Sequence, residues 1–174
     1  MRLFWHRRDL RLADNVGLTH AIEAAEDGES LHPLAVIDPA ILERAGPPRA
    51  TFFLRSLAEL QGAYRDHGSD LRVETGDPAT VVAGIAEDED VTGVHWNRDL
   101  SGYARRRDEA VSDALSSLDV DITADDDLLL HEPGSILTNA GDTYRVFSPF
   151  FDKWHDREKA APHPEPESDR LASV

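Results

Sequence analysis

The chain has 174 residues, a length typical of one domain or of one domain with a tail, and long enough to bury a hydrophobic core without crosslinks. It contains no cysteine, which excludes disulfides, thiolate metal sites and cysteine nucleophiles. Arg2 places a charge too early for a secretory signal, and no apolar run reaches membrane-spanning length, so we expect a cytoplasmic protein with no membrane partner.

The charge balance is strongly acidic. Eighteen basic residues, sixteen of them arginine, stand against thirty-four acidic residues and give a formal net charge of −16. High salt screens the resulting self-repulsion, to within about 3 Å at 1 M, so the composition indicates adaptation to a salt-rich cytoplasm, as in halophilic archaea. An ordinary acidic protein is the alternative, which the scarcity of lysine disfavours. A chain this negative is not expected to hold DNA phosphates over most of its surface.

The first half of the chain alternates short apolar strands with amphipathic helices. In chain order we predict a strand at 3–5, a helix capped by Asp14 or Asn15, a strand at 34–37 and, after a loop with Pro47 and Pro48, a long helix ended by Gly68. The long helix is indicated by an apolar stripe at helical spacing, formed by Phe53, Leu57, Leu60 and Tyr64.

The second half continues the same alternation. In chain order we predict a strand at 71–75, a helix capped by Asp77 with Pro78 at its first position, a strand at 91–96, a helix from about Tyr103 and a strand at 120–123. Repeated strand–helix units require parallel strands joined by right-handed crossovers. We therefore predict an α/β fold, a Rossmann-like five-stranded parallel sheet with helices on both faces.

The C-terminal region has a different character. A last helix is predicted from Ser148-Pro149, with an aromatic stripe that we interpret as core and domain packing and that consists of Phe147, Phe150, Phe151 and Trp154. From Ala160 the sequence is rich in proline and glutamate and has no periodicity. The sequence thus divides into a domain over residues 1–155 and a linker or disordered tail over 156–174.

Polar side chains follow several predicted strands. Parallel strands end at one edge of the sheet, and ligands bind there where the strand order reverses. The polar side chains at this edge would form a ring of mixed charge, with Trp5 and Trp96 nearby. A ring of this kind suits a planar heteroaromatic ligand. The equally open alternative is that these side chains pair with one another and cap helices. The ring consists of His6-Arg7-Arg8-Asp9, Asp38, Asp77 and Asn97-Arg98-Asp99.

The sequence lacks the motifs of several common catalytic, phosphate-binding and metal-binding sites. The sequence has no glycine-rich phosphate loop, no serine-nucleophile elbow and no histidines at zinc-ligand spacing, so we predict no catalytic or metal site. We interpret Asp125-Asp126-Asp127 as a solvated acidic loop, and Arg105 with Glu109 as a helical ion pair.

Four blocks of sequence resemble one family. The run Trp5-His6-Arg7-Arg8-Asp9-Leu10-Arg11-Leu12 resembles the opening of the DNA photolyase/cryptochrome family. Blocks at 49–60, 96–108 and 144–154 resemble later segments of that family in the same order. Together they extend over residues 1 to about 155.

The resemblance implies a function in light harvesting. The family's N-terminal α/β domain binds an antenna pigment, and its larger helical domain binds FAD and splits pyrimidine dimers in DNA by photoinduced electron transfer. This chain resembles only the first domain. The expectation is therefore the antenna domain of a deoxyribodipyrimidine photolyase (a carbon–carbon lyase), with FAD and damaged DNA bound only through a helical domain that this sequence lacks. A cryptochrome-like photoreceptor domain and a stand-alone α/β module that binds a nucleotide or a protein are the alternatives.

The resemblance also bears on the pigment. Folate-binding members carry an Asn-Glu pair where this chain has Tyr103-Ala104, so folate is disfavoured. The deazaflavin-binding subgroup is favoured, with 8-hydroxy-5-deazaflavin or an F420-like pigment before FMN. Arginine can donate to a ring carbonyl or an ionised hydroxyl, and aspartate can accept from a ring N–H. The residues carried over to the pigment site are His6, Arg7, Asp38, Arg49, Asp99, Gly102 and Tyr103.

Overall fold

The computed structural model describes residues 1–26 and 28–173 and contains one five-stranded parallel sheet. The strands lie in the order β3-β2-β1-β4-β5, so the order reverses between β1 and β4. The predicted α/β class and the parallel sheet are confirmed. In chain order the elements are β1 (Arg2–His6), α1 (Val16–Glu23), β2 (Leu31–Ile37), α2 (Pro39–Arg44), α3 (Pro47–Asp66), β3 (Arg72–Thr75), α4 (Pro78–Asp88), β4 (Gly93–Asn97), α5 (Gly102–Leu115), β5 (Asp121–Asp125), α6 (Phe147–Asp156) and a 3-10 turn at Ser168–Arg170.

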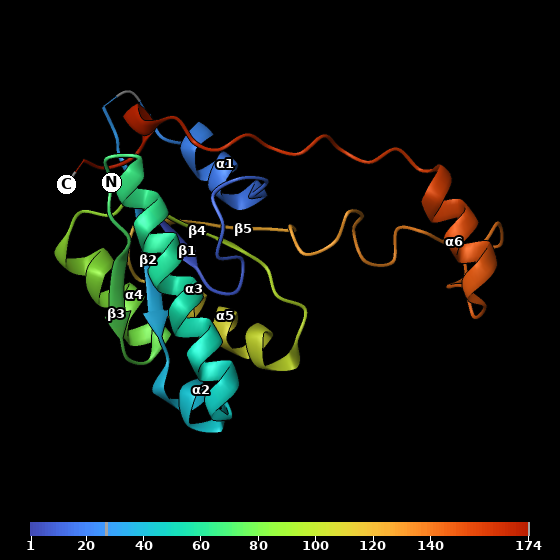
Figure 1. The fold of residues 1–174 in the computed structure, drawn as a ribbon, viewed down its shortest axis with the longest axis horizontal. Coiled ribbons are helices and arrows are strands. Elements are labelled where there is room, and N and C mark those ends of the chain that lie inside the picture. The colour runs from blue at the N-terminus through green and yellow to red at the C-terminus, as the bar shows by residue number, and fades with distance from the viewer. Residues whose placement is uncertain (27, 174) are drawn as a thin grey trace.

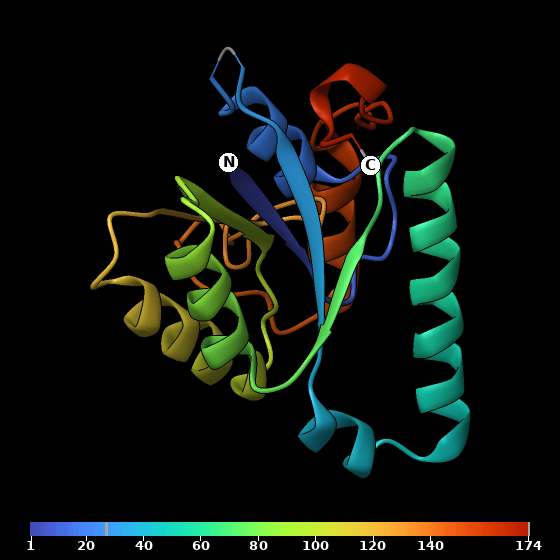
Figure 2. The ribbon, with the colours of Figure 1, turned by 90° about the vertical axis from the view of Figure 1, so that its left-hand side faces the viewer.

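Two hydrophobic cores lie on opposite faces of the sheet, as Figure 2 shows with α3 on one side and α4 and α5 on the other. Successive side chains of a strand point to opposite faces, so Leu3 and Trp5 of β1 join the core under α4 and α5, whereas Phe4 joins the core under α1 and α3. Both tryptophans of the sheet, Trp5 and Trp96, are 1% exposed and belong to the first of these cores.

Side-chain caps fix where the helices begin. Asn15 accepts from the Leu18 N–H at 3.1 Å, and Asp77 accepts from the Thr80 N–H at 3.0 Å. The predicted loop at Pro47-Pro48 is wrong, because the two prolines form the first turn of α3, where a fixed φ and a missing N–H are tolerated. Helix α2 was not predicted. It is six residues long and buries none of them, so it leaves no periodic signal.

The C-terminal segment leaves the sheet and returns to it. Figure 1 shows α6 standing apart from the sheet, and none of its residues is buried, so its aromatic stripe belongs to neither core. The chain then runs back in extended form to the start of α1, where the Asp14 N–H donates to the His163 carbonyl at 2.8 Å. Leu171 pairs with Leu31 of β2 and is 4% exposed, so the tail ends in contact with the domain. None of the helices in the described part combines the length and apolarity needed to cross a membrane.

Candidate functional site

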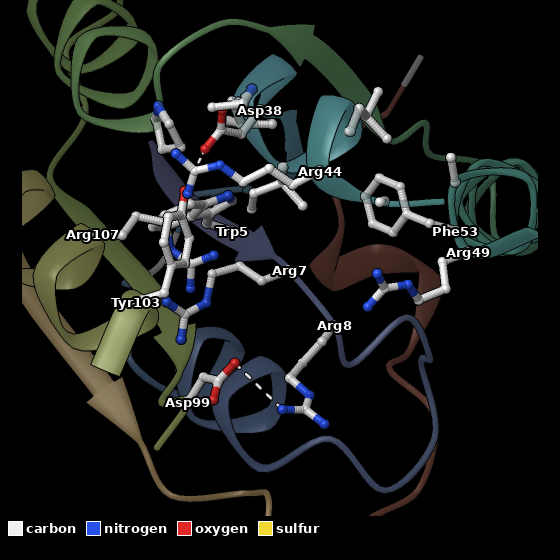
Figure 3. A pocket seen from close by; sticks show the side chains of 17 residues that line it. Trp5, Arg7, Arg8, Asp38, Arg44, Arg49, Phe53, Asp99, Tyr103 and Arg107 are labelled. Carbon is white, nitrogen blue, oxygen red and sulfur yellow. Dashed lines mark hydrogen bonds and ion pairs between the residues drawn. The ribbon is translucent and has the colours of Figure 1, made fainter. Parts of the chain in front are cut away.

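A cavity of about 540 Å³ opens at the carboxyl edge of the sheet, on the side of α4 and α5. Strands β1 and β2 form its floor, α2 and the first turns of α3 cover one side, and α5 closes the other (Figure 3). Its walls are largely apolar, with charged groups around them. The lining residues are Trp5, Arg7, Arg8, Val36, Asp38, Ala40, Ile41, Leu42, Arg44, Ala45, Arg49, Ala50, Phe53, Pro78, Asp99, Tyr103 and Arg107.

Five of the seven predicted site residues meet at this cavity. They come from four separate segments of the chain, and they are Arg7, Asp38, Arg49, Asp99 and Tyr103. Gly102 is the first residue of α5 and lies beside the cavity without lining it.

His6 does not belong with them. It points to the opposite face of β1, where it is 1% exposed and its Nε2 lies 2.6 Å from the Tyr64 hydroxyl of α3. The physical reason is the alternation along a strand, which sends Trp5 to one face of the sheet and His6 to the other. Burial lowers the pKa of His6 below its ordinary value, so it is a neutral packing residue of the α1 and α3 core.

Arg7 is held by the protein itself. Its side chain is 3% exposed, and it donates hydrogen bonds to the Asp108 carboxylate of α5 and to the Asn97 carbonyl of β4. Its guanidinium carbon also lies 5.1 Å from the centre of the Trp5 ring, as does that of Arg107. The Arg7 Nε is buried and has no hydrogen-bond partner among the described residues. Arg7 is therefore a fixed, positively charged part of the cavity wall.

Tyr103 and Asp38 are joined across the cavity. The Tyr103 hydroxyl donates to Asp38 Oδ2 at 2.5 Å, while Asp38 Oδ1 accepts from the Ala40 N–H at 2.8 Å and caps α2. Loss of solvent around the phenol, together with the Asp38 carboxylate, raises the pKa of Tyr103 to about 12. Tyr103 is therefore a neutral hydrogen-bonding group over the whole physiological pH range.

Asp99 is engaged in a similar way. Partial burial opposes its ionisation, but the Ser101 N–H, which donates at 2.9 Å, and the Arg8 guanidinium at 3.3 Å outweigh that effect and lower its pKa. Asp99 therefore presents a carboxylate at the cavity rim. The two interpretations of the polar ring prove compatible, because these side chains pair with one another and still enclose a cavity.

At the point where the strand order reverses, a polar cluster centred on Asn97 lies beside a second, smaller cavity of about 360 Å³. The Asn97 side chain lies there and donates to Asp9 Oδ2 at 2.5 Å and to Asn15 Oδ1 at 2.7 Å, and its Oδ1 accepts from the Gly17 N–H at 2.9 Å. Asp127 contacts the same amide at 3.2 Å. Asn97 is thus structural, and the larger cavity lies one strand away, over β1 and β2.

Two minor predictions are wrong. Asp127 is not solvated, because its side chain is 6% exposed and pairs with Arg11 at 2.6 Å. No ion pair joins Arg105 to Glu109 among the described residues. The prediction of no metal site stays a prediction, although no group of three or more metal-ligating side chains occurs in residues 1–26 and 28–173.

No sequence signal indicates the α2 side of the cavity. Arg44, Ile41 and Leu42 come from that unpredicted helix, and Arg107 reaches the cavity from the second turn of α5. For Phe53 there was a signal, because it lies on the predicted apolar stripe of α3 but is only half-buried, at the end that faces the cavity.

The cavity matches the size and chemistry of a site for a planar ligand. Its volume lies within the range of about 300–1,000 Å³ that is usual for small-molecule sites. An aromatic wall at Trp5, apolar side chains on the α2 side and a few fixed polar groups are the elements such a ligand requires.

Comparison with known proteins places the chain in a family. The family model described as DNA photolyase matches residues 2–167. The deoxyribodipyrimidine photo-lyase of Halobacterium salinarum is 49% identical over 179 residues, which cover 99% of this chain and 37% of that protein. The deoxyribodipyrimidine photo-lyase of a Synechococcus strain is 38% identical over 92% of this chain and 33% of its own length.

Solved structures agree with this. A Synechocystis cryptochrome superposes with a TM-score of 0.87 at 22% identity, over 99% of this chain and 37% of its own, which shows the shared fold. A class III photolyase from Agrobacterium tumefaciens gives a TM-score of 0.83 at 27% identity, over 99% of this chain and 35% of its own. An archaeal photolyase from Sulfolobus tokodaii, which contains two FAD molecules and implies a novel light-harvesting cofactor, gives 0.79 at 26% identity, over 97% of this chain and 40% of its own.

The chain spans between 33% and 40% of the length of these photolyases and of the cryptochrome. Its ordered strands and helices correspond to the α/β domain with which they begin. The chain belongs to the DNA photolyase family, as a homologue of the N-terminal α/β domain of deoxyribodipyrimidine photolyases and cryptochromes.

Proposed function

We propose that the cavity at the carboxyl edge binds a planar, light-absorbing pigment, and that the chain is the antenna domain of a deoxyribodipyrimidine photolyase. The observation that supports this most directly is the cavity itself, in which four segments of the chain place an aromatic wall and fixed charged groups around one space. An antenna requires a rigid, water-poor site and no acid–base chemistry. Three hydrogen bonds inside the protein supply that rigidity. They join Arg7 to Asp108, Tyr103 to Asp38, and the Ser101 N–H to Asp99.

Of the pigments considered, we propose 8-hydroxy-5-deazaflavin or an F420-like molecule, with FMN and folate as weaker candidates. The bound pigment would supply absorption in the near-ultraviolet or blue and pass its excitation energy on. Arg7 lines the cavity, and its guanidinium gives that wall a positive charge suited to an electron-rich ring oxygen. Asp38, Arg49, Asp99 and Tyr103 line the same space, and Gly102 lies beside it. His6 is not included in this site.

We further propose that the pigment domain works with a helical FAD domain, through which damaged DNA is bound. The relatives are nearly three times as long as the part that this chain matches. Helix α6 exposes Phe147 by 71% and Phe151 by 41%, an aromatic face that neither core of the described residues uses. Packing against a second domain would remove this apolar area from water. In this proposal residues 156–174 begin the connection between the domains.

The pigment proposal is tested by equilibrium binding to the purified chain in molar KCl. We expect 8-hydroxy-5-deazaflavin to bind, with folate and FMN weaker and ATP absent. Ala50→Trp places a large side chain in the cavity from α3 and should abolish pigment binding. Ala58→Trp, at an exposed position of the same helix outside the cavity, should leave it unchanged. Binding of ATP alone would instead favour a nucleotide-binding module, and pigment binding that survives Ala50→Trp would place the site elsewhere.

The repair activity requires a second experiment. The chain can be fused to the remaining part of the Halobacterium salinarum photolyase, with which it shares 49% identity. We expect light-dependent loss of cyclobutane pyrimidine dimers from DNA by this chimera and none by the chain alone. A chimera that binds FAD and leaves dimers intact under light would contradict the lyase assignment and favour a photoreceptor.

A further inference from the structure

The cavity has a charge opposite to that of the protein. Acidic residues outnumber basic ones by 34 to 18 in the whole chain. Among the lining residues, however, arginine outnumbers aspartate by five to two. A cationic cavity in so acidic a chain indicates a ligand that carries negative charge.

Three of the five arginines are already engaged. Arg7 and Arg107 both contact Asp108, the latter at 3.3 Å, and Arg8 contacts Asp99 at 3.3 Å. The second lining carboxylate, Asp38, is taken by Tyr103 and by the N-terminus of α2. Both lining carboxylates, Asp38 and Asp99, are therefore already engaged within the protein.

Arg44 and Arg49 are different. Among the described residues, neither has an acidic group within 4 Å, and neither side chain donates a hydrogen bond within the protein. Arg44 is the last residue of α2 and Arg49 lies in the first turn of α3, so the short link between these helices brings both to the same side of the cavity. Figure 3 shows Arg44 extending across the cavity toward Tyr103 and Arg49 entering it beside Phe53.

We propose that the ligand of this cavity bears a phosphate ester on its side chain, and that Arg44 and Arg49 bind that phosphate. The inference rests on the proposed pigment function and narrows it to phosphorylated pigments. Guanidinium groups match phosphate oxygens with paired N–H donors, and such charge-assisted hydrogen bonds are about twice as strong as neutral ones. A nucleic acid is a poor alternative occupant, because the net charge of −16 opposes the approach of a long polyanion.

One pair of compounds isolates the phosphate, because riboflavin and FMN share one ring and differ only in that group. A second pair, 8-hydroxy-5-deazaflavin and F420, shares another ring, and F420 adds the phosphate together with a tail that carries carboxylates. The ratio of dissociation constants within a pair cancels the affinity of the ring. Binding is measured with the whole chain in 1 M KCl, where charges act only over about 3 Å and long-range attraction is removed.

We expect the phosphorylated member of at least one pair to bind about tenfold more tightly, which corresponds to about 1.4 kcal/mol. The double variant Arg44→Gln with Arg49→Gln should bring that ratio close to one, whatever its effect on the affinity for the unphosphorylated member. Arg55→Gln removes an exposed arginine later on α3, outside the cavity, and should preserve the ratio.

The outcomes separate the two proposals. Equal affinities within both pairs would overturn the phosphate inference and leave the pigment function standing. A preference for phosphate that survives the double variant would overturn the assignment to Arg44 and Arg49. If no member of either pair binds, the pigment function itself fails, and the phosphate inference with it.

Discussion

The Tyr103 hydroxyl and the Asp38 carboxylate, 65 residues apart in sequence, form a 2.5 Å hydrogen bond that ties the start of α5 to the start of α2. The two helices follow β4 and β2, which are not neighbours in the sheet. The bond therefore fixes the width of the cavity between them.

The first prediction concerns the ionisation of Tyr103. Burial and the Asp38 carboxylate raise its pKa to about 12, whereas an unfolded tyrosine ionises near pH 10. A folded pKa above the unfolded one stabilises the fold below pH ~10, and that contribution is lost as the pH rises toward 12. Asp38→Asn removes the charge, so we expect the Tyr103 phenolate to form at lower pH.

The pKa of Tyr103 is measured from phenolate absorbance during alkaline titration. The Tyr103→Phe variant identifies the part of the absorbance that comes from Tyr103. Asp142→Asn, at an exposed position remote from the cavity, serves as the control. An identical Tyr103 titration in wild type and Asp38→Asn would show that the hydrogen bond does not form in solution.

The second prediction concerns Asp108, whose carboxylate neutralises the charge of the buried Arg7 guanidinium. Asp108→Ala leaves that guanidinium without its carboxylate and beside the like charge of Arg107. Loss of one partner of a buried pair costs about 3–5 kcal/mol, and we expect a decrease of that size in the free energy of unfolding. Denaturant titration in constant KCl measures it. The neighbouring Glu109→Ala, at an exposed position, should change it by less than about 0.5 kcal/mol, and similar effects of the two substitutions would contradict the ion pair.

The third prediction contrasts two helical glycines. A Cβ at Gly17 would lie 2.4 Å from Asn97 Oδ1 and 3.1 Å from Phe4 Cε2, so Gly17→Ala must displace the amide at the reversal of strand order. We expect a loss of about 1–3 kcal/mol of stability. Gly62 lies within α3 with no atom within 4 Å of its Cβ position, so Gly62→Ala should add about 0.5–1 kcal/mol. Thermal unfolding of both variants checks the opposite signs, and a stable Gly17→Ala variant would contradict the packing around Asn97.

The fourth prediction concerns salt. A net charge of −16 on a chain this short produces self-repulsion that molar KCl screens. We expect the melting temperature to rise between low and molar KCl. An unchanged melting temperature would contradict the interpretation of the acidic composition as salt adaptation and would leave family membership unaffected.

The fold was predictable because the signals for it are local. Short apolar stretches, helical periodicity and caps such as Asn15 and Asp77 each lie within a few residues of the element they define. The site was predictable only in part. Contacts such as Arg7 with Asp108 join residues far apart in sequence, and α2 buries no residue that would reveal it.

His6 shows a signal that was present in the sequence. It stands between Trp5 and Arg7 in a strand, so strict alternation assigns it to the other face of the sheet. Its place within a family motif does not override that rule. A motif identifies the residues that matter in a family, and the period of the strand decides which of them face a ligand.

The surroundings of Trp5 have a photochemical consequence. An indole beside an excited dye commonly quenches the excited state by donating an electron to the dye. This transfer leaves a positive charge on the indole ring. Here two guanidinium carbons lie 5.1 Å from the centre of that ring, and their charges oppose the formation of a third cation beside them. Trp5, which is only 1% exposed, is therefore hard to oxidise, and a dye in the cavity near it would keep its excited state long enough to pass the energy on.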